Sequence, residues 1–536
     1  MPSDRSNPDR EIARGICQVT VVDVLRVRER VFGFSAPFSS VIRARLNSEF
    51  RMSAQILLQG RLEGTEQFLL AIPADRDNRA FEARSTWLVL VGEAIPRALL
   101  AELQLPPLML GSSGGDRFFV ILPDRGRADA AGEFLTRVSQ ALGELSAGKL
   151  SIVWSSTENL GDWTIVRKRL QEGMRAGIGG GAQPKAAEPG YFDPFPAPGA
   201  GPDRIPRDLR EAPAIAWSFN FPALIAPASD SETGDVKPGD YRWDVSSQGT
   251  IPVTRHGARN GEAFASTREL ARRARGQRLW GVLRGEIDDF GTRMRRLQSV
   301  EEHVHISMLY RQFLTGEIEL LCSQGEYFQR VTVLQAGEAD FSLYGSWDAL
   351  AGFARELERV FSRFSQENLK DLPGAEAKTV TMALTIAEPG ASLARTYEDC
   401  GRDLEIARAT DKDCLHILGR VLEWKQLNDA ADLKDAIVHL NEEFRGARQF
   451  LGQLRNLYKK VEGPDGDEQR LMARALRFQR RFARAATRRE REFQKLRAHL
   501  MKEMAGRNLA GQGRRGRLKL RPEGLIALEW ARLAED

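Results

Sequence analysis

One order of elements occurs twice along the 536 residues, and it constrains the fold more than any single motif does. In each half an apolar run is followed by a helical pattern, two apolar runs around a short turn, a second helical pattern and a further apolar run. Periods of 2 and 3.6 residues in this order predict an α+β domain with a mostly antiparallel sheet. Because the two halves share little sequence, we expect an internal duplication at the level of the fold.

The first half carries the weaker copy of this pattern. Residues 16–25 are a β-branched apolar run that predicts a buried strand. A helix is expected at about 39–58, and the short apolar runs 67–72 and 86–91 are typical of strands. A hairpin follows at 107–123, because Gly114-Gly115-Asp116 separates two apolar runs. The half ends with a helix, a strand and a helix, expected at 128–145, 150–154 and 163–174.

The second half repeats the order more clearly. Its first strand is expected at 279–287, and a hairpin turns at Gly337-Glu338-Ala339-Asp340. Apolar residues at helical spacing predict a long amphipathic helix directly after this hairpin. The remaining elements are a helix at 300–314, this amphipathic helix at 347–364, a strand at 380–386, a helix at 393–409 and a short strand at 415–418.

Composition separates these halves from two other regions. Residues 184–252 hold 12 of the 24 prolines, which excludes long helices and central strands there. From residue 429 onward the pattern is helical, with 25 Lys and Arg against 16 Asp and Glu, a net charge of +9 in a chain of +5. Such a basic end favours contact with a polyanion. The domains that we expect are a first α+β domain at 10–175, a Pro/Gly-rich connector at 176–253, a second α+β domain at 254–428, and an all-α domain at 429–536.

Several function classes lack their sequence signals. The four cysteines are far apart, so neither a disulfide framework nor a zinc ribbon is expected. None of the six histidines is followed by Asp, and the chain has no H-E-x-x-H motif and no phosphate-loop motif. No apolar run reaches 18 residues, so we expect no membrane contact and a cytoplasmic location.

Acidic residues end the first strand of the second half. Glu286, Asp288 and Asp289 follow its apolar run, and Asp340 stands at the tip of the hairpin. In a ferredoxin-like β-α-β-β-α-β sheet these two strands lie side by side, so their carboxylates converge. Two converging carboxylates are what a two-metal phosphoryl-transfer site requires. The hairpin glycines would let a nucleotide approach the backbone.

These motifs resemble a known family. The stretch 283–291 is similar to the first palm strand of the large subunit of type III CRISPR–Cas effector complexes, whose palm domains belong to the polymerase and cyclase class. The segment 343–348 resembles the stretch after that family's Gly-Gly-Asp-Asp hairpin, and 412–424 resembles its Lys-Asn, Phe-Gly and Trp stretch. Residues 114–119 resemble its other palm domain. The resemblance implies two ferredoxin-like palm domains, a basic helical C-terminal domain, and a vestigial nucleotide-binding set at Gly114, Gly115, Gly337, Glu338, Arg408 and Lys412.

The departures from the family pattern point to lost catalysis. The family often begins with a His-Asp nuclease domain, and no His-Asp dipeptide occurs here. Glu338 replaces the second glycine of the hairpin, Ala339 replaces its first aspartate, and Glu286 replaces the leading aspartate of the first strand. We expect no catalytic residue and no metal, with Glu286, Asp288 and Asp340 as a vestigial set. Glu286 and Asp340 are the pair that would hold an ion if one bound.

The favoured function is therefore a structural large subunit, without cyclic oligoadenylate synthesis, that helps to bind guide and target RNA. The partners implied by the resemblance are CRISPR RNA, target RNA, a subunit that binds the guide 5′ end, a small helical subunit and backbone subunits. One alternative is an active nucleotidyl cyclase that uses Mg²⁺; the favoured reading needs no cofactor. Another is a stand-alone nucleic-acid-binding protein. The arginines that we expect to contact nucleic acid are Arg477, Arg480, Arg481, Arg484, Arg488, Arg514, Arg515 and Arg517.

Overall fold

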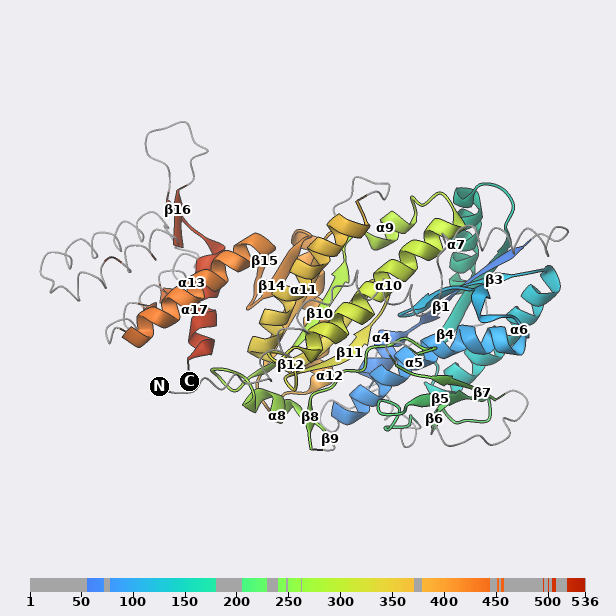
Figure 1. The fold of residues 1–536 in the computed structure, drawn as a ribbon, viewed down its shortest axis with the longest axis horizontal. Helices are drawn as coiled ribbons and strands as arrows, with labels where there is room; N and C mark the ends of the chain where they lie inside the picture. Colours follow the sequence, from blue (N-terminus) through green and yellow to red (C-terminus); the bar gives the residue numbers. More distant parts are fainter. Residues whose placement is uncertain are drawn as a thin grey trace, which may run out of the picture.

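Two sheets, one antiparallel and one mostly antiparallel, share the order of four strands and form the body of the molecule (Figure 1). The structure, a computed structural model, describes residues 55–71, 78–179, 205–228, 240–246, 249–261, 263–370, 378–443, 451–452, 455–456, 495, 500, 504–507 and 518–535. The strand that the sequence predicts at residues 16–25 lies outside these residues. We call residues 55–179 the first lobe and residues 280–423 the second lobe.

The first lobe is a four-stranded sheet in the order β2-β3-β1-β4. Its elements are β1 (Ile56–Glu63), α4 (Thr65–Leu70), α5 (Asn78–Glu102), β2 (Leu110–Gly114), β3 (Arg117–Leu122), α6 (Arg125–Leu145), β4 (Ser151–Glu158) and α7 (Trp163–Gly179). The predicted hairpin and the elements after it are confirmed. Two expectations are wrong, because 67–72 lies largely in α4 and 86–91 lies inside α5. Ile56, which was assigned to a helix, begins β1 instead.

The second lobe repeats this order and extends it. Its sheet runs β11-β12-β10-β13-β14-β15, in which only β13 and β14 are parallel. Its elements are β10 (Trp280–Ile287), α9 (Phe290–Met294), α10 (Val300–Ser323), β11 (Val331–Ala336), β12 (Asp340–Ser346), α11 (Trp347–Asn368), β13 (Val380–Ala387), α12 (Leu393–Thr410), β14 (Cys414–Ile417) and β15 (Arg420–Glu423). Each lobe's hairpin also has a bulge in its register, between Leu110 and Ser112 in one and between Val333 and Gln335 in the other. The shared strand order and bulges match the duplication that the sequence pattern predicts.

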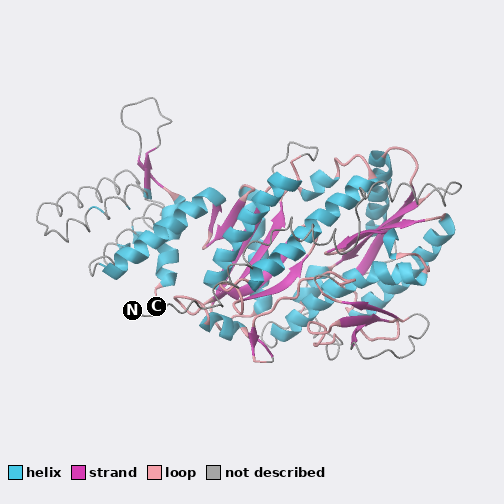
Figure 2. Ribbon diagram, in the orientation of Figure 1, coloured by secondary structure: helices cyan, strands magenta, loops and turns pink. Residues whose placement is uncertain are grey.

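Helices cover both faces of each sheet (Figure 2). One helix of each lobe also packs against the other lobe. Alternating residues of β3 show the two faces of the first sheet, because Phe118 packs with α5 and α6 whereas Phe119 packs with α7. Helix α10 of the second lobe also reaches this second face through Val304. In return, Phe81 of α5 packs against Tyr397 of α12, on one face of the second sheet.

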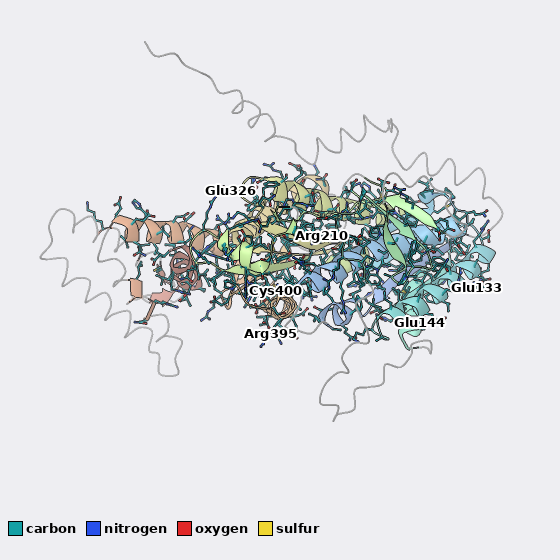
Figure 3. The ribbon with its side chains drawn as sticks, turned by 90° about the horizontal axis from the view of Figure 1, so that it is seen from below. Glu133, Glu144, Arg210, Glu326, Arg395 and Cys400 are labelled. Carbon is teal, nitrogen blue, oxygen red and sulfur yellow. The ribbon has the colours of Figure 1, made fainter. Side chains whose placement is uncertain are left out.

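The described part of the Pro-rich connector packs against the two lobes. Its strands β5 (Ala214–Trp217), β6 (Ile225–Ala228) and β7 (Tyr241–Asp244) form a small sheet, and Trp217 is fully buried against the first lobe. A second pair, β8 (Arg259–Asn260) and β9 (Ala263–Phe264), precedes α8 (Thr267–Arg272). Arg210 donates to the carbonyls of His256 (2.9 Å) and Val333 (2.6 Å), and it lies near the middle of the molecule in Figure 3. The connector therefore fixes β11 to the rest of the body.

The described C-terminal residues contain strand as well as helix, which differs from the expected all-α domain. Helix α13 (Trp424–Glu443) packs against α17 (Pro522–Ala534) and continues the core of the second lobe. The short strands β16 (Ala505–Arg507) and β17 (Leu518–Leu520) pair antiparallel. Among the described residues, no helix is long and apolar enough to cross a membrane.

Candidate functional site

The acidic end of β10 meets the hairpin β11–β12 as the strand order requires. Glu286 on β10 lies directly opposite Asp340 on β12. A backbone hydrogen bond from Gly337 N to Asp340 O (2.8 Å) closes the turn, and one from Ile287 N to Ala339 O (2.7 Å) joins the turn to the end of β10. The fold therefore brings together the two carboxylates that the sequence singled out.

Glu286 is already paired with a basic group of the protein. Arg408 on α12 approaches its carboxylate at 2.5 Å, and the same guanidinium donates to Glu405 at 2.7 Å. Burial raises the pKa of Glu286, Arg408 opposes this rise, and the negative charge of Asp288 adds to it. One carboxylate of the predicted pair is therefore already engaged by a guanidinium of the chain.

Asp288 is a structural residue that ties three strands together. Its side chain is buried, with 2% of the residue exposed. One carboxylate oxygen accepts from Thr381 Oγ1 (2.7 Å), and the other accepts from Thr379 Oγ1 (2.8 Å) and from Asp413 N (3.1 Å). These donors come from the beginning of β13 and the approach to β14. With both oxygens engaged, Asp288 is poorly placed to bind a metal.

The neighbouring Asp289 is also engaged within the chain, in this case by a basic side chain. It has a left-handed backbone with φ of 54°, and its carboxylate binds Lys412 Nζ at 2.6 Å. The hydrogen bond to Asp289 raises the pKa of Lys412. Arg408 and Lys412, which the resemblance implies as nucleotide contacts, therefore both bind acidic residues of this chain.

Asp340 lies at the tip of the hairpin and is exposed to solvent. Gln335 Nε2 donates to its Oδ2 at 2.9 Å. The packing around its carboxylate raises the pKa of Asp340 by desolvation, and the charge of Asp116 on the other hairpin raises it further. Asp116 itself is held by Arg61, at 2.8 Å.

The two hairpin turns touch one another directly. A Cβ placed on Gly337 would stand 3.1 Å from the Cα of Gly115, and one placed on Gly114 would stand 3.3 Å from the Cβ of Glu338. Gly115 has a φ of +60°, which favours glycine, and a Cβ on Gly92 of α5 would meet its carbonyl oxygen at 2.9 Å. The turns therefore pack glycine against glycine, and the backbones leave no room for a nucleotide between them at this contact.

A buried ion network lies behind this contact, and the sequence interpretation missed it. Glu93 of α5 is 3% exposed and binds Arg97 (2.7 Å), Arg311 of α10 (2.8 Å) and the Ser113 hydroxyl (2.9 Å). The two arginines lower the pKa of Glu93 against the desolvation that raises it. One signal was available, because an isolated Glu within the apolar run of 86–100 indicates a buried, paired charge.

The residues at this edge do not fit a two-metal centre. Ala339 offers no ligand, Asp288 has both oxygens engaged, and Glu286 is paired with Arg408. Within the described ranges, no group of three or more His, Cys, Asp or Glu is arranged to hold a metal ion. The arginines expected to contact nucleic acid, at 477–488 and 514–517, lie outside the described residues.

Two family models match the two lobes. Residues 279–416 match the model described as Cas10/Cmr2, second palm domain, and residues 54–168 match the Csm1 subunit domain B. The chain is 24% identical, over 199 residues, to the CRISPR system single-strand-specific deoxyribonuclease Cas10/Csm1 (subtype III-A) of Enterococcus italicus. That match covers 36% of this chain and about a quarter (24%) of the relative's length.

Solved structures have a similar fold. A Csm1–Csm4 cassette in complex with cA4 matches with a TM-score of 0.66 and 17% identity, covering 90% of this chain and 70% of the other. Csm1 of T. onnurineus matches with a TM-score of 0.64 and 14% identity, covering 92% and 71%. At these identities the matches concern the fold. Together with the two family models and the curated relative, they show what both lobes are similar to: the domains of Cas10/Csm1, a component of type III CRISPR systems.

Proposed function

We propose that this chain is a structural large subunit of a type III CRISPR effector complex and that it does not synthesise cyclic oligoadenylates. We also infer that each sheet with its two packed helices is a ferredoxin-like palm. One observation supports the loss of turnover above the others: Glu286, Asp288 and Asp289 are all engaged by groups of the chain itself. Metal-assisted phosphoryl transfer needs carboxylates free to hold ions between the substrate oxygens.

The contact between the hairpins supports the same proposal. Glu338 places a bulky carboxylate where the family pattern has glycine, beside Gly114 of the first lobe. At about 4 Å and an effective dielectric near 20, two like charges repel by roughly 4 kcal/mol. A triphosphate would meet this repulsion in addition to the steric contact.

The partners are proposed from the relatives. Solved relatives are described as Csm1 in complex with Csm4, so we propose that a Csm4-like subunit binds this chain within an assembly that also holds guide and target RNA. The arginines of the C-terminal part would provide electrostatic contact with the phosphate backbone. Purification from cells through a tag on this chain tests the assembly: recovery of guide RNA and several smaller subunits supports it, whereas recovery of the chain with non-specific nucleic acid favours a stand-alone binding protein.

An active cyclase is the second candidate, because Glu286 and Asp340 face each other across the sheet. The test is incubation of the assembled complex with target RNA, ATP and either Mg²⁺ or Mn²⁺, followed by mass spectrometry of the products. We expect no cyclic oligoadenylate, while a complex that contains an active Cas10 relative provides the positive control. Product above trace level in a target-dependent manner would overturn the proposal.

A further inference from the structure

A basic segment lies at the end of the second sheet that is farthest from Glu286. Residues 259–278 contain six arginines and two glutamates, with no lysine and no aspartate. They form β8, β9, α8 and the loop that leads into β10, at the lower edge of the second lobe in Figure 1. Because β10 has 8 residues, at about 3.3 Å per residue this end is roughly 25 Å from the acidic edge. Four exposed arginines of this segment are called here the arginine surface: Arg268, Arg272, Arg275 and Arg278.

The backbone that carries the arginine surface is held in place from two sides. Gln277 N donates to the carbonyl of Leu533 in α17 at 2.8 Å. Arg275 N donates to Asp348 at the start of α11 at 3.2 Å. Arg273, between these exposed arginines, uses its guanidinium for two backbone carbonyls instead. A backbone that is already fixed reduces the conformational entropy lost when a partner binds.

Little negative charge faces these arginines. Glu269 is the one acidic residue of α8, and it lies 3.4 Å from Arg272. Asp348 is already paired with Arg330. Within the described residues, the other three members of the arginine surface form no ion pair with a carboxylate of the chain. The surface therefore presents more positive charge than its own surroundings neutralise, which favours a polyanionic partner.

An exposed aromatic side chain lies at the same end of the sheet. Phe328 is 50% exposed, and its ring centre is 6.0 Å from that of His256. It comes just before β11, which runs parallel to β10 because both strands pair antiparallel with β12. The two strands therefore begin at the same edge, two strand spacings or about 10 Å apart. The residue after Phe328, Gln329, accepts a hydrogen bond from Arg273, so the aromatic ring is next to the arginine segment.

We propose that the arginine surface and Phe328 form a docking site for single-stranded RNA. The guanidinium groups bind phosphates, because their planar forks match phosphate oxygens, and the phenyl ring stacks with an unpaired base. A duplex keeps its bases stacked inside the helix, so an exposed ring favours a single strand. The choice of RNA over DNA rests on the proposed function. The site is separate both from the edge of Glu286 and from the arginines of the C-terminal part.

The test is binding of a fluorescent oligouridylate to the purified full chain, followed by anisotropy at several salt concentrations. Arg275→Glu combined with Arg278→Glu should raise the Kd about tenfold or more. It should also reduce the slope of log K against log salt by about 1.4 or more, because each phosphate contact of a single strand contributes about 0.7. Phe328→Ala should raise the Kd about fivefold or more without changing this slope, since stacking is not ionic. Binding of duplex RNA should not depend on Phe328.

Arg125→Glu combined with Arg175→Glu is the matched control, because it makes the same change of net charge at exposed arginines of the first lobe. Its Kd and salt slope should stay close to those of the unsubstituted chain. If the double variant of the arginine surface and Phe328→Ala both bind the oligouridylate as the control does, the inference fails.

Two further outcomes would also overturn it. Unchanged RNA binding together with loss of smaller subunits in the tagged purification would identify an acidic protein as the partner of this surface. Single-stranded DNA that competes as well as RNA would overturn the choice of RNA. Because the purified chain is used alone, this result is independent of the cyclic oligoadenylate assay and of guide RNA recovery, which test the proposed function.

Discussion

At the scale of single residues, identical carboxylates in this chain have different roles because their surroundings differ. Asp288 accepts three hydrogen bonds and holds strands together, whereas Glu286, two residues earlier, forms an ion pair at the edge. A vestigial metal role and a structural role therefore predict different effects of substitution. The structure favours the structural role for Asp288.

Asp288→Asn should destabilise the fold. The amide would present a donor toward Asp413 N or toward a threonine hydroxyl, so at least one buried donor would lose its acceptor, at a cost of about 2–3 kcal/mol in the free energy of unfolding. Urea denaturation measures this loss. Asp129→Asn is the control, because its ion pair with Arg125 is exposed and should contribute little. An unchanged urea midpoint for Asp288→Asn would contradict the structural role.

A second residue should give the protein a pH-dependent stability. Glu317 of α10 is 7% exposed, and burial raises its pKa from 4.5 to about 7. Because the folded state holds this proton more tightly than the unfolded state, its contribution is complete below about pH 4.5 and is lost as the pH rises through about 7. The difference is about 3 kcal/mol. Above pH 8, Glu317→Gln should therefore be more stable than the unsubstituted chain by about this free energy of unfolding. The measurement is the free energy of unfolding as a function of pH, with exposed Glu326→Gln as the control. If Glu317→Gln, the control and the unsubstituted chain have parallel pH profiles, the effect is excluded.

At the scale of elements, the reciprocal exchange of α5 and α10 determines how the lobes are joined. Each is the first long helix of its lobe, and each also covers part of the other lobe's sheet. Glu93 and Arg311 connect these two helices at the point where the hairpin turns meet. The join is therefore both apolar and ionic.

Arg311→Ala should weaken this join strongly. It removes one partner of a buried carboxylate and the donor to Ser113, which typically costs about 3–5 kcal/mol. Hydrogen exchange should then increase at the turns 114–116 and 337–339 before it increases elsewhere. Arg402→Ala, which removes an exposed ion pair of α12, should leave both Tm and exchange unchanged. Equal behaviour of the two variants would show that the network contributes little.

The sequence predicted the second lobe almost completely, because its strands and helices differ in period and in length. The first lobe was harder. The run 86–91 consists of apolar residues that are buried on all sides, and such a run has no period that separates a buried strand from a buried helix. Strand order alone predicted that Glu286 and Asp340 face each other. The hydrogen bond between Asp288 and Thr381 and the contact between Gly115 and Gly337 instead depend on packing between residues far apart in the sequence. No local pattern encodes such contacts.

At the scale of the whole molecule, the two lobes form one cooperative unit. A single apolar cluster contains Trp87 and Phe134 of the first lobe together with Val282 and Tyr344 of the second. Tyr344 also donates to Glu82 of α5 at 2.7 Å. A core of this kind cannot be lost from one lobe while it remains intact in the other.

We therefore expect one unfolding transition for both lobes. In calorimetry the van't Hoff and calorimetric enthalpies of the main transition should agree, and protection of β3 and β12 amides should be lost at the same denaturant concentration. A charge introduced into the aromatic contact of His303 with Phe119 and Trp163, as in His303→Asp, should lower both midpoints together. Exposed His439→Asp serves as the control. Two separate transitions would contradict a shared core.

The sharing of α5 between two sheets also affects how the protein is made. During translation this helix leaves the ribosome well before helix α12, which covers one side of it, since Phe81 and Tyr397 are separated by more than three hundred positions. Until those elements are synthesised, a nascent first lobe exposes an apolar surface to solvent. Such a surface is a target for chaperones, and a ribosome stalled between the lobes would release a fragment prone to aggregation.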